Sequence, residues 1–242
     1  MHGLGLVFIP RHGKGHRYNP SEVPYAANIY ALKSLGVDTL ISFNAVGSLK
    51  EEIEPRHFIV PDQLFDRTRG IRRSSFFTDG VVAHAGFGDP YCGELREILA
   101  RAAGKAGAVV HHGGTLVVME GPAFSTRAES EFYRAQGWDL IGMTTLPEAK
   151  LAREAGICYA TLAMSTDYDC WRVSGESVTL EMVLAVVKDN VKMAGKVLSE
   201  ALQLLAKGRP ADCGCRVPIG TMTAPEASSS TRLSQLETIL KR

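Results

Sequence analysis

The stretch ICYATLAM, residues 157–164, is a continuous apolar run that predicts a strand buried on both faces. Strands of this kind belong to sheets that carry helices on both sides. A helix is predicted just before it at 147–155, and a long amphipathic helix follows from about residue 174 to residue 207. This alternation predicts an α/β fold: a single domain with a mostly parallel central sheet flanked by helices.

The same alternation extends towards the N-terminus. Apolar spacing and capping residues predict helices at 19–35, 94–106 and 126–136, and strands at 6–9, 39–43, 57–60, 115–119 and 139–141. Residues 66–90 have weak periodicity and several glycines, which predicts loops. We expect one domain over residues 1–208 and a C-terminal tail over 209–242 that ends in a short helix at 233–240.

Composition narrows the class of partner. The 242 residues are 45% apolar and 22% charged, with a net charge of +1. Acidic and basic residues are interspersed, so neither a nucleic-acid surface nor a membrane surface is indicated. No run reaches the apolar length of a membrane span, and the N-terminal residues lack the pattern of a secretory signal. We therefore expect a cytoplasmic protein whose partners are small molecules.

Five cysteines are present, too few and too scattered for a disulfide scaffold. Cys213 and Cys215 form the only tight pair. A zinc site would require two more ligands nearby in the fold, and the sequence offers no matching Cys-His pair. The sequence therefore favours free thiols or a local redox-sensitive bridge, and no metal.

Polar residues follow the ends of several predicted strands, where ligands bind in such sheets. These residues are Arg11 and His12, residues 44–48, Asp62, residues 120–125, residues 142–145, and Asp167 and Asp169. Each has an ordinary structural explanation alone, as a surface turn, a cap or a core aromatic. Together, an Arg, a His and backbone amides suit a phosphate, while Phe124 and two carboxylates suit an amino-bearing heteroaromatic ring. The residues alone thus predict a phosphate-plus-purine site without a metal.

Six motifs carry a family resemblance. They are RHG at 11–13, NAVGSL at 44–49, PDQLFDRT at 61–68, EGPAFSTRAES at 120–130, MTTLPEAKLAREAGICYA at 143–160 and TDYDCW at 166–171. In this order and spacing they closely resemble the 5′-methylthioadenosine phosphorylases, which belong to the trimeric purine nucleoside phosphorylases. The resemblance covers about residues 6–208. It implies phosphate-dependent cleavage of 5′-methylthioadenosine to adenine and 5-methylthioribose 1-phosphate, a pentosyl transfer used in purine and methionine salvage, by a homotrimer.

The resemblance also implies roles for individual residues. Those implied for phosphate binding are Arg11, His12, Asn44, Ala45 and Thr144. Those implied for the nucleoside are Phe124, Ser125, Ile141, Met143, Asp167, Asp169, Leu180, Val183 and Leu184, together with His84, which would reach a neighbouring subunit's 5′ pocket. Asp167 and Asp169 are the implied catalytic pair, and we hypothesise that Asp167 is the acid at purine N7. No cofactor is expected beyond inorganic phosphate as co-substrate.

Three positions bear on the substrate. Relatives that cleave 6-oxopurine nucleosides carry Glu where this chain has Ser125, and Asn where it has Asp167. A carboxylate accepts from a 6-amino group and repels a 6-oxo oxygen, so adenine is favoured. Those relatives place a His on the 5′-hydroxyl where Leu180 stands here. An apolar lining leaves a 5′-hydroxyl unpaired, at a cost of about 1–3 kcal/mol. Methylthioadenosine should be preferred over adenosine, and both over inosine.

The N-terminus departs from the family pattern. Family members have a strand and a Gly-rich phosphate loop ahead of the strand that carries Arg11 and His12, and nothing of that kind precedes Leu6. Either the start codon was assigned too late or the protein is truncated. If the 242 residues are the whole protein, we expect a sheet short of one strand, a phosphate site short of one wall, and weak or absent activity. Two alternatives stay open: a purine nucleoside or methylthioinosine phosphorylase, and a catalytically impaired purine-binding remnant. The pair Cys213 and Cys215 resembles a C-x-C pair of some family members.

Overall fold

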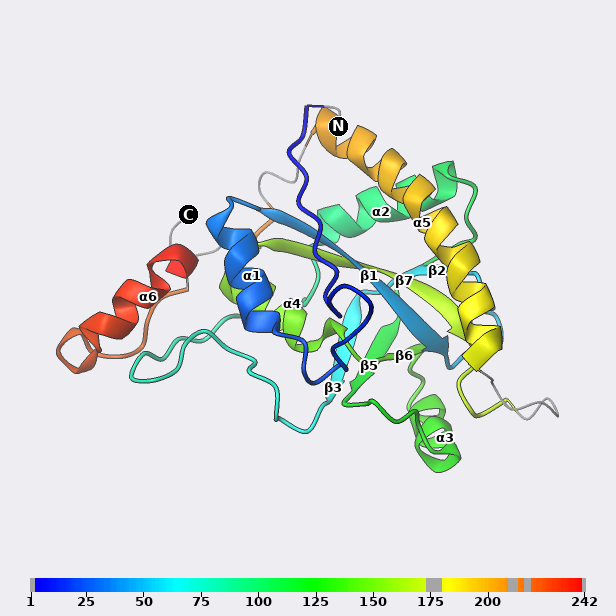
Figure 1. The fold of residues 1–242 in the computed structure, drawn as a ribbon, viewed down its shortest axis with the longest axis horizontal. Helices are drawn as coiled ribbons and strands as arrows, with labels where there is room; N and C mark the ends of the chain where they lie inside the picture. Colours follow the sequence, from blue (N-terminus) through cyan, green and yellow to red (C-terminus); the bar gives the residue numbers. More distant parts are fainter. Residues whose placement is uncertain (1–2, 173–179, 209–212, 216–218, 241–242) are drawn as a thin grey trace.

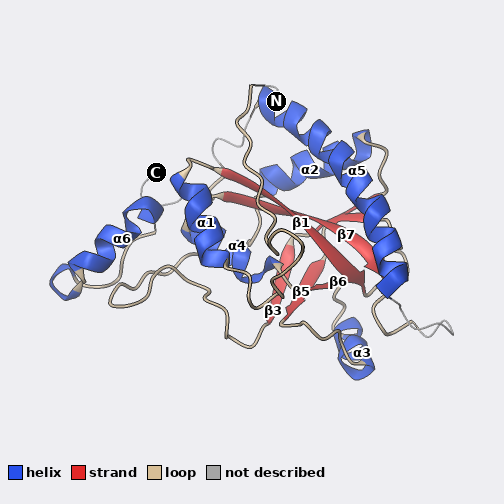
Figure 2. Ribbon diagram, viewed as in Figure 1, coloured by secondary structure: helices blue, strands red, loops and turns tan. Residues whose placement is uncertain are grey.

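The computed structural model describes residues 3–172, 180–208, 213–215 and 219–240. A single α/β domain surrounds one mixed sheet (Figures 1 and 2). The elements in chain order are α1 (Tyr25–Ser34), β1 (Thr39–Ser48), β2 (Phe58–Val60), β3 (Gln63–Arg67), α2 (Gly93–Lys105), β4 (Val110–His112), β5 (Thr115–Met119), α3 (Arg127–Ala135), β6 (Leu140–Gly142), α4 (Thr145–Glu154), β7 (Cys158–Asp167), α5 (Leu180–Lys207), a 3-10 turn (Pro225–Ala227) and α6 (Ser230–Leu240).

The sheet has seven strands in the order β3-β5-β6-β1-β7-β2-β4. Four of its six pairings are parallel among the described residues, and the pairs β1–β6 and β2–β7 are antiparallel. The predicted α/β class with a mostly parallel sheet is thus confirmed. Because β6 runs against β1, however, the polar residues do not share one carboxyl edge. They gather where the end of β1 passes the start of β6.

Strand β7 lies in the middle of the molecule and is buried along nearly its whole length, as its apolar run predicts. Its side chains alternate between two apolar clusters, as strand geometry requires. Cys158, Ala160 and Leu162 pack towards α2 and α5 on one face. Tyr159 and Ala163 pack on the other face, where α1 and α4 lie. Helix α6 packs against α1 on the outside of that second layer (Figure 1).

The predicted strand at residues 6–9 is wrong. This segment is extended but pairs with no described strand, and Leu6, Val7 and Phe8 are exposed. Among the described residues β6 pairs only with Gly47 and Ser48 of β1, so residues 39–46 of β1 keep an open edge, but the segment 6–9 lies across a cleft from that edge and forms no ladder with it. The neighbouring strand, β1, is in turn longer than predicted, because it continues through Asn44 to Ser48.

Strand β4 (Val110–His112) was not predicted, because two of its three residues are histidines and it carries no apolar pattern. The strand β3, at Gln63–Arg67, falls partly inside the region predicted as loop. The helix α3 matches its prediction closely: Thr126 caps it, and Glu129 closes a capping box with the Thr126 backbone. No described helix combines the length and apolar character needed to cross a membrane.

Candidate functional site

Of the predicted nucleoside residues, Ile141, Asp167 and Asp169 converge where β1, β6 and β7 meet. Gly47 pairs with Ile141 in one neighbouring strand and with Asp167 in the other. A Cβ placed on Gly47 would lie 3.2 Å from the Asp167 carboxylate and 3.4 Å from Asp169 Cβ. The absence of a side chain at this glycine therefore lets both acids approach the backbone of β1. We call this corner, made of Gly47, Ile141, Asp167 and Asp169, the carboxylate corner.

The loop that follows β5 borders the carboxylate corner. The Cys170 thiol donates to the Ser125 carbonyl at 3.2 Å, which ties this loop to the turn after Asp169. Ser125 is half-buried, whereas Phe124 is 75% exposed. An aromatic ring with a free face next to two carboxylates is a suitable surface for stacking a flat heterocycle.

The two carboxylates differ in their surroundings. Asp167 accepts from the Thr166 hydroxyl at 2.6 Å and from the Asp169 backbone N–H at 2.8 Å. Asp169 is 9% exposed, and its Oδ2 makes no hydrogen bond among the described residues. Burial raises the pKa of Asp169, and the charge of Asp167 raises it further, against an opposing effect of the Ser130 hydroxyl. Asp169 therefore holds its proton to higher pH than an ordinary aspartate does.

This raised pKa predicts a stability effect. The folded protein keeps the Asp169 proton in a pH range where the unfolded chain has lost it, so stability falls as pH rises through that range. Asp169→Asn removes the buried charge, and its amide tolerates the positive φ of 52° at this position. The variant should be more stable than the native chain at pH 7.5, by about 1.4 kcal/mol for each pH unit by which the pKa is raised.

Urea denaturation of both proteins at pH 7.5 and at pH 4 checks this. The advantage of Asp169→Asn should shrink at pH 4, where the native carboxyl is protonated as well. Asp79→Asn is the matched control, because Asp79 is an exposed aspartate that also has a positive φ. Equal destabilisation by Asp169→Asn at both pH values would contradict the expectation.

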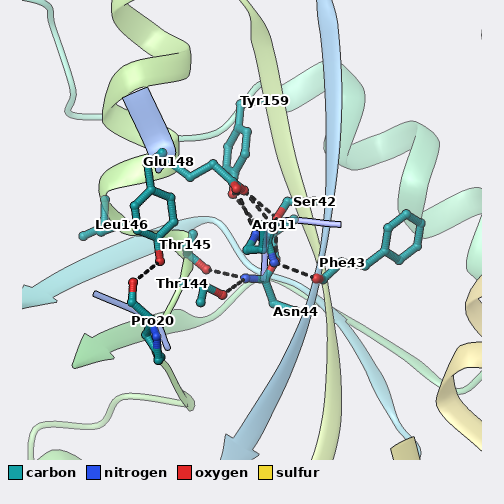
Figure 3. A network of polar contacts seen from close by, with 12 residues as sticks. Arg11, Pro20, Ser42, Phe43, Asn44, Thr144, Thr145, Leu146, Glu148 and Tyr159 are labelled. Carbon is teal, nitrogen blue, oxygen red and sulfur yellow. Dashed lines mark hydrogen bonds and ion pairs between the residues drawn. The ribbon is translucent and has the colours of Figure 1, made fainter. Parts of the chain in front are cut away.

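The predicted phosphate residues lie in a second group, a polar network beside β1 (Figure 3). Asn44 donates to the hydroxyls of Thr144, at 2.9 Å, and Thr145, at 3.2 Å, and it accepts at 2.6 Å from Ser42. Asn44 and Thr144 are buried, while Ala45 is exposed. The loop before α4 is thereby fixed to β1, with the hydroxyl of Thr144 at the N-terminus of that helix.

Arg11 belongs to this network through its guanidinium. It pairs with both carboxylate oxygens of Glu148, at 2.9 and 2.8 Å, and also donates to the Phe43 carbonyl and the Ser42 hydroxyl. Tyr159 donates to the same carboxylate at 3.0 Å (Figure 3). The charge of Arg11 is therefore balanced by Glu148 in a buried setting. An anion that binds at Arg11 would have to share the guanidinium with Glu148.

His12 follows Arg11 in the chain and is oriented by local contacts. Its Nδ1 lies 2.9 Å from the Tyr18 carbonyl, and its ring stacks on His16 with centroids 4.2 Å apart. Burial lowers the pKa of His12, although the Tyr18 carbonyl opposes this. Arg11 and His12 line a cleft of about 940 Å³ between the N-terminal segment, α1, β1 and α5. Asp167 and Asp169 are outside the lining of that cleft.

A third group joins the loops after β5 and β6. Arg72 donates from Nε to Glu120 at 2.7 Å, and from Nη1 to the carbonyls of Met143, at 2.6 Å, and Leu146, at 2.8 Å. Its Nη2 donates to the Glu120 carbonyl. Arg72 and Glu120 are both buried. Glu120, whose role the sequence left open between loop orientation and a ribose contact, thus holds the loop in place.

The remaining predicted residues lie elsewhere. His84 is exposed in the loop between β3 and α2, and Leu184 is exposed near the start of α5. Leu180 and Val183 belong to α5, but their side chains fall outside the described part of the structure. Sequence reasoning missed Ser42, Arg72 and Glu148, each of which binds a residue at least 31 positions away. A polar residue inside an apolar segment was a signal for Ser42, but Arg72 stands in the polar stretch 67–75 and carried none.

Comparisons with known protein families, curated proteins and solved structures all find phosphorylases. Residues 2–203 match the family model described as the phosphorylase superfamily. The S-methyl-5′-thioadenosine phosphorylase of Geobacter sulfurreducens is 48% identical, over 99% of this chain and 84% of its own length. That of Chloroflexus aurantiacus is 59% identical, over 84% of this chain and 70% of its own length. A crystal structure of a methylthioadenosine phosphorylase from an antarctic soil metagenomic library superposes with a TM-score of 0.90, at 45% identity, over 97% of this chain and 83% of that one.

Proposed function

Because the chain belongs to the phosphorylase superfamily, we propose that it is a nucleoside phosphorylase that cleaves 5′-methylthioadenosine with inorganic phosphate. The products are adenine and 5-methylthioribose 1-phosphate. The observation that carries the proposal is the carboxylate corner, where two acids and Ser125 meet beside an exposed aromatic ring. The names of the relatives point to the same substrate.

The carboxylate corner binds the adenine base. Phe124 stacks on the base and the ribose, and the two carboxylates face its N7 and 6-amino edge. Met143 meets the ribose hydroxyls through its backbone, next to the carbonyl that Arg72 fixes. Ile141, which is buried beside Gly47, closes the apolar side of the base site.

The chemistry follows from charge. Cleavage of the bond at C1′ passes through a ribosyl oxocarbenium ion, while negative charge builds on the leaving purine. A carboxylic acid at N7 neutralises that charge, which is worth about 10²- to 10⁴-fold in rate for a positioned acid. Sequence reasoning assigned the acid to Asp167, whereas the raised pKa belongs to Asp169. Asp167 remains the proposed acid at N7, and the buried Asp169 with its raised pKa lies beside it.

Phosphate is the nucleophile and the only co-substrate that the reaction requires. It binds at the polar network, against Arg11, His12, Asn44, the backbone of Ala45 and Thr144. A phosphate held beside the oxocarbenium ion supplies proximity and electrostatic stabilisation. Its charge competes with Glu148 for the guanidinium of Arg11, so binding of phosphate rearranges that ion pair.

The proposal also covers the oligomeric state and the cellular location of the enzyme. We place the active enzyme as a homotrimer in the cytoplasm. In the trimer, His84 reaches the 5′ pocket of a neighbouring subunit, and its exposed position in the loop between β3 and α2 leaves it free to do so. Leu180, Val183 and Leu184 line the same pocket with apolar side chains that suit a methylthio group.

A substrate panel tests the function. Adenine release from methylthioadenosine should require phosphate and should exceed release from adenosine, because an unpaired 5′-hydroxyl costs about 1–3 kcal/mol, or about 5- to 150-fold in kcat/KM. Inosine should be the poorest of the three, since its 6-oxo oxygen faces a carboxylate. A chain that binds adenine but cleaves none of the three would be a purine-binding remnant. A preference for inosine would favour a 6-oxopurine nucleoside phosphorylase.

A further inference from the structure

Four of the five cysteines gather at one place, far from the carboxylate corner. The sulfur atoms of Cys92, Cys158, Cys213 and Cys215 all lie within 4.8 Å of one another. They come from three separate parts of the chain: the start of α2, the start of β7 and the segment after α5. Nothing in the sequence predicts two further ligands near the pair Cys213 and Cys215, and the fold supplies them.

The spacing of the sulfurs suits a metal. In a tetrahedral zinc site the Zn–S bond is about 2.3 Å, which places the sulfurs about 3.8 Å from each other. The sulfurs of Cys158 and Cys213 are 3.2 Å apart, well beyond the roughly 2.05 Å of a disulfide bond. All four thiols are free of disulfides. Four convergent sulfurs satisfy a closed tetrahedral shell without any further ligand.

Two of the cysteines are held by rigid elements. Cys92 precedes the first turn of α2, and its N–H donates to the Tyr159 carbonyl at 2.8 Å. Cys158 opens β7, and its N–H donates to the Asp38 carbonyl at 2.9 Å. Both are buried in the apolar layer between the sheet and α2 and α5. The N-terminal end of α2 also favours a thiolate at Cys92.

The other two cysteines lie on one turn. Gly214 separates them and adopts a φ of 71°, a left-handed conformation that a glycine accepts without strain. This turn brings both sulfurs to the same side, towards Cys92 and Cys158. Cys215 is buried and Cys213 is half-buried, so the side chains of this turn pack against the body of the domain. An apolar pocket of four thiols gives a soft cation a dry, all-sulfur environment.

We propose that Cys92, Cys158, Cys213 and Cys215 bind one zinc ion as thiolates and so fasten the segment after α5 to the body of the domain. A closed shell of four sulfurs leaves no open position, so the ion is structural. The distance between the proposed zinc ion and the carboxylate corner agrees with a structural role. Cys158 and Asp167 stand at opposite ends of the ten-residue strand β7, which spans about 30 Å. The proposal is independent of the proposed nucleoside chemistry.

The test is the metal content of the full chain. Protein purified without chelator should contain one zinc ion per chain by mass spectrometry of the elements. The organomercurial titrant p-hydroxymercuribenzoate should release this zinc as it blocks the thiols. Replacement by cobalt(II) should give the visible and near-ultraviolet absorption of a tetrahedral all-sulfur site. Removal of zinc should lower Tm without changing the far-ultraviolet circular dichroism of the sheet and helices.

Variants assign the ligands. The double variant Cys213→Ser with Cys215→Ser should lose the zinc, whereas Cys170→Ser, which changes the one cysteine outside the cluster, should keep it. Two results on the native chain would overturn the proposal even if the double variant does not fold. One is five freely reactive thiols with no bound metal. The other is a mass lower by the hydrogens of a disulfide bond, again with no metal.

Discussion

Asp167→Asn should lower kcat/KM for phosphorolysis of methylthioadenosine by about 10²- to 10⁴-fold, the usual contribution of a positioned general acid. The amide has the shape of the carboxyl group but cannot give a proton to the leaving purine. The loss should appear mainly in kcat, because stacking on Phe124 and the phosphate site are unchanged. Asp167 is only partly buried, so the fold should survive the change.

Steady-state kinetics with the native chain, Asp167→Asn and Asp169→Asn would separate the roles of the two acids. If the proton on Asp169 supports the reaction, kcat/KM of the native chain should fall as pH rises through the raised pKa of Asp169. Asp79→Asn is again the control, since its exposed side chain lies in the loop between β3 and α2. Undiminished phosphorolysis by Asp167→Asn would remove Asp167 from the role of acid. A pH profile that is lost only in Asp169→Asn would transfer that role to Asp169.

The same variant carries a second readout. In relatives that cleave 6-oxopurine nucleosides, Asn stands at the position of Asp167 and Glu at that of Ser125. An amide can donate to a 6-oxo oxygen, which a carboxylate repels. Activity of Asp167→Asn towards inosine should therefore fall less than its activity towards methylthioadenosine. A merely structural role for Asp167 would lower both activities alike, so the ratio distinguishes recognition of the base from damage to the fold.

Sequence reasoning succeeded where the information is local. The strand β7 and the helix α3 depend on residues within one element, and both were predicted. It failed at the segment 6–9, because a strand forms only when a neighbouring backbone lies at pairing distance, and a cleft separates this segment from the open edge of β1. Residue types predict what a segment favours, whereas the positions of distant strands decide what it can pair with.

For the candidate site, too, local motifs identified some residues, whereas partners from distant parts of the chain were missed. Family motifs identify Asp167 and Asp169, and the structure brings both to Gly47. Glu148 was not foreseen, although it neutralises Arg11 from a position 137 residues away. Glu148 stands inside the motif at 143–160 and Arg11 inside the motif at 11–13, but nothing in either motif says that the two side chains pair. The cysteine cluster shows even more clearly that distant partners cannot be predicted from motifs. Two of its members stand alone in the sequence and become neighbours only through the fold.

The ion pair between Arg72 and Glu120 should be the most sensitive structural feature of the site. Glu120→Ala should lower the free energy of unfolding by about 3–5 kcal/mol, because it leaves the Arg72 charge buried without a partner. Burial alone would raise the pKa of Glu120, but hydrogen bonds from Ser21, Arg69 and Arg72 outweigh burial and hold it low. This contribution is present above the ordinary pKa of a glutamate and is lost as pH falls through the lower pKa of the folded state.

Urea denaturation at pH 7.5 measures the effect. Asp66→Ala serves as the control, because it breaks an ion pair with Lys150 in which both side chains are about one-third exposed. Such pairs contribute about 1 kcal/mol or less. The double variant Arg72→Met with Glu120→Leu should recover part of the loss, since it removes both charges together. Equal effects of Glu120→Ala and Asp66→Ala would show that the buried pair adds nothing beyond a surface contact.

The ion pair should also act on catalysis from a distance. Arg72 bonds the Met143 carbonyl, and Glu120 begins the loop that carries Phe124. Freed from each other, the loops after β5 and β6 would lose the separation that a bound nucleoside requires. At a temperature where Glu120→Ala remains folded, KM for methylthioadenosine should therefore rise while the pH profile set by Asp167 and Asp169 stays unchanged. An altered pH profile would instead place Glu120 in contact with the reacting groups, and a normal KM would show that the loops keep their positions without it.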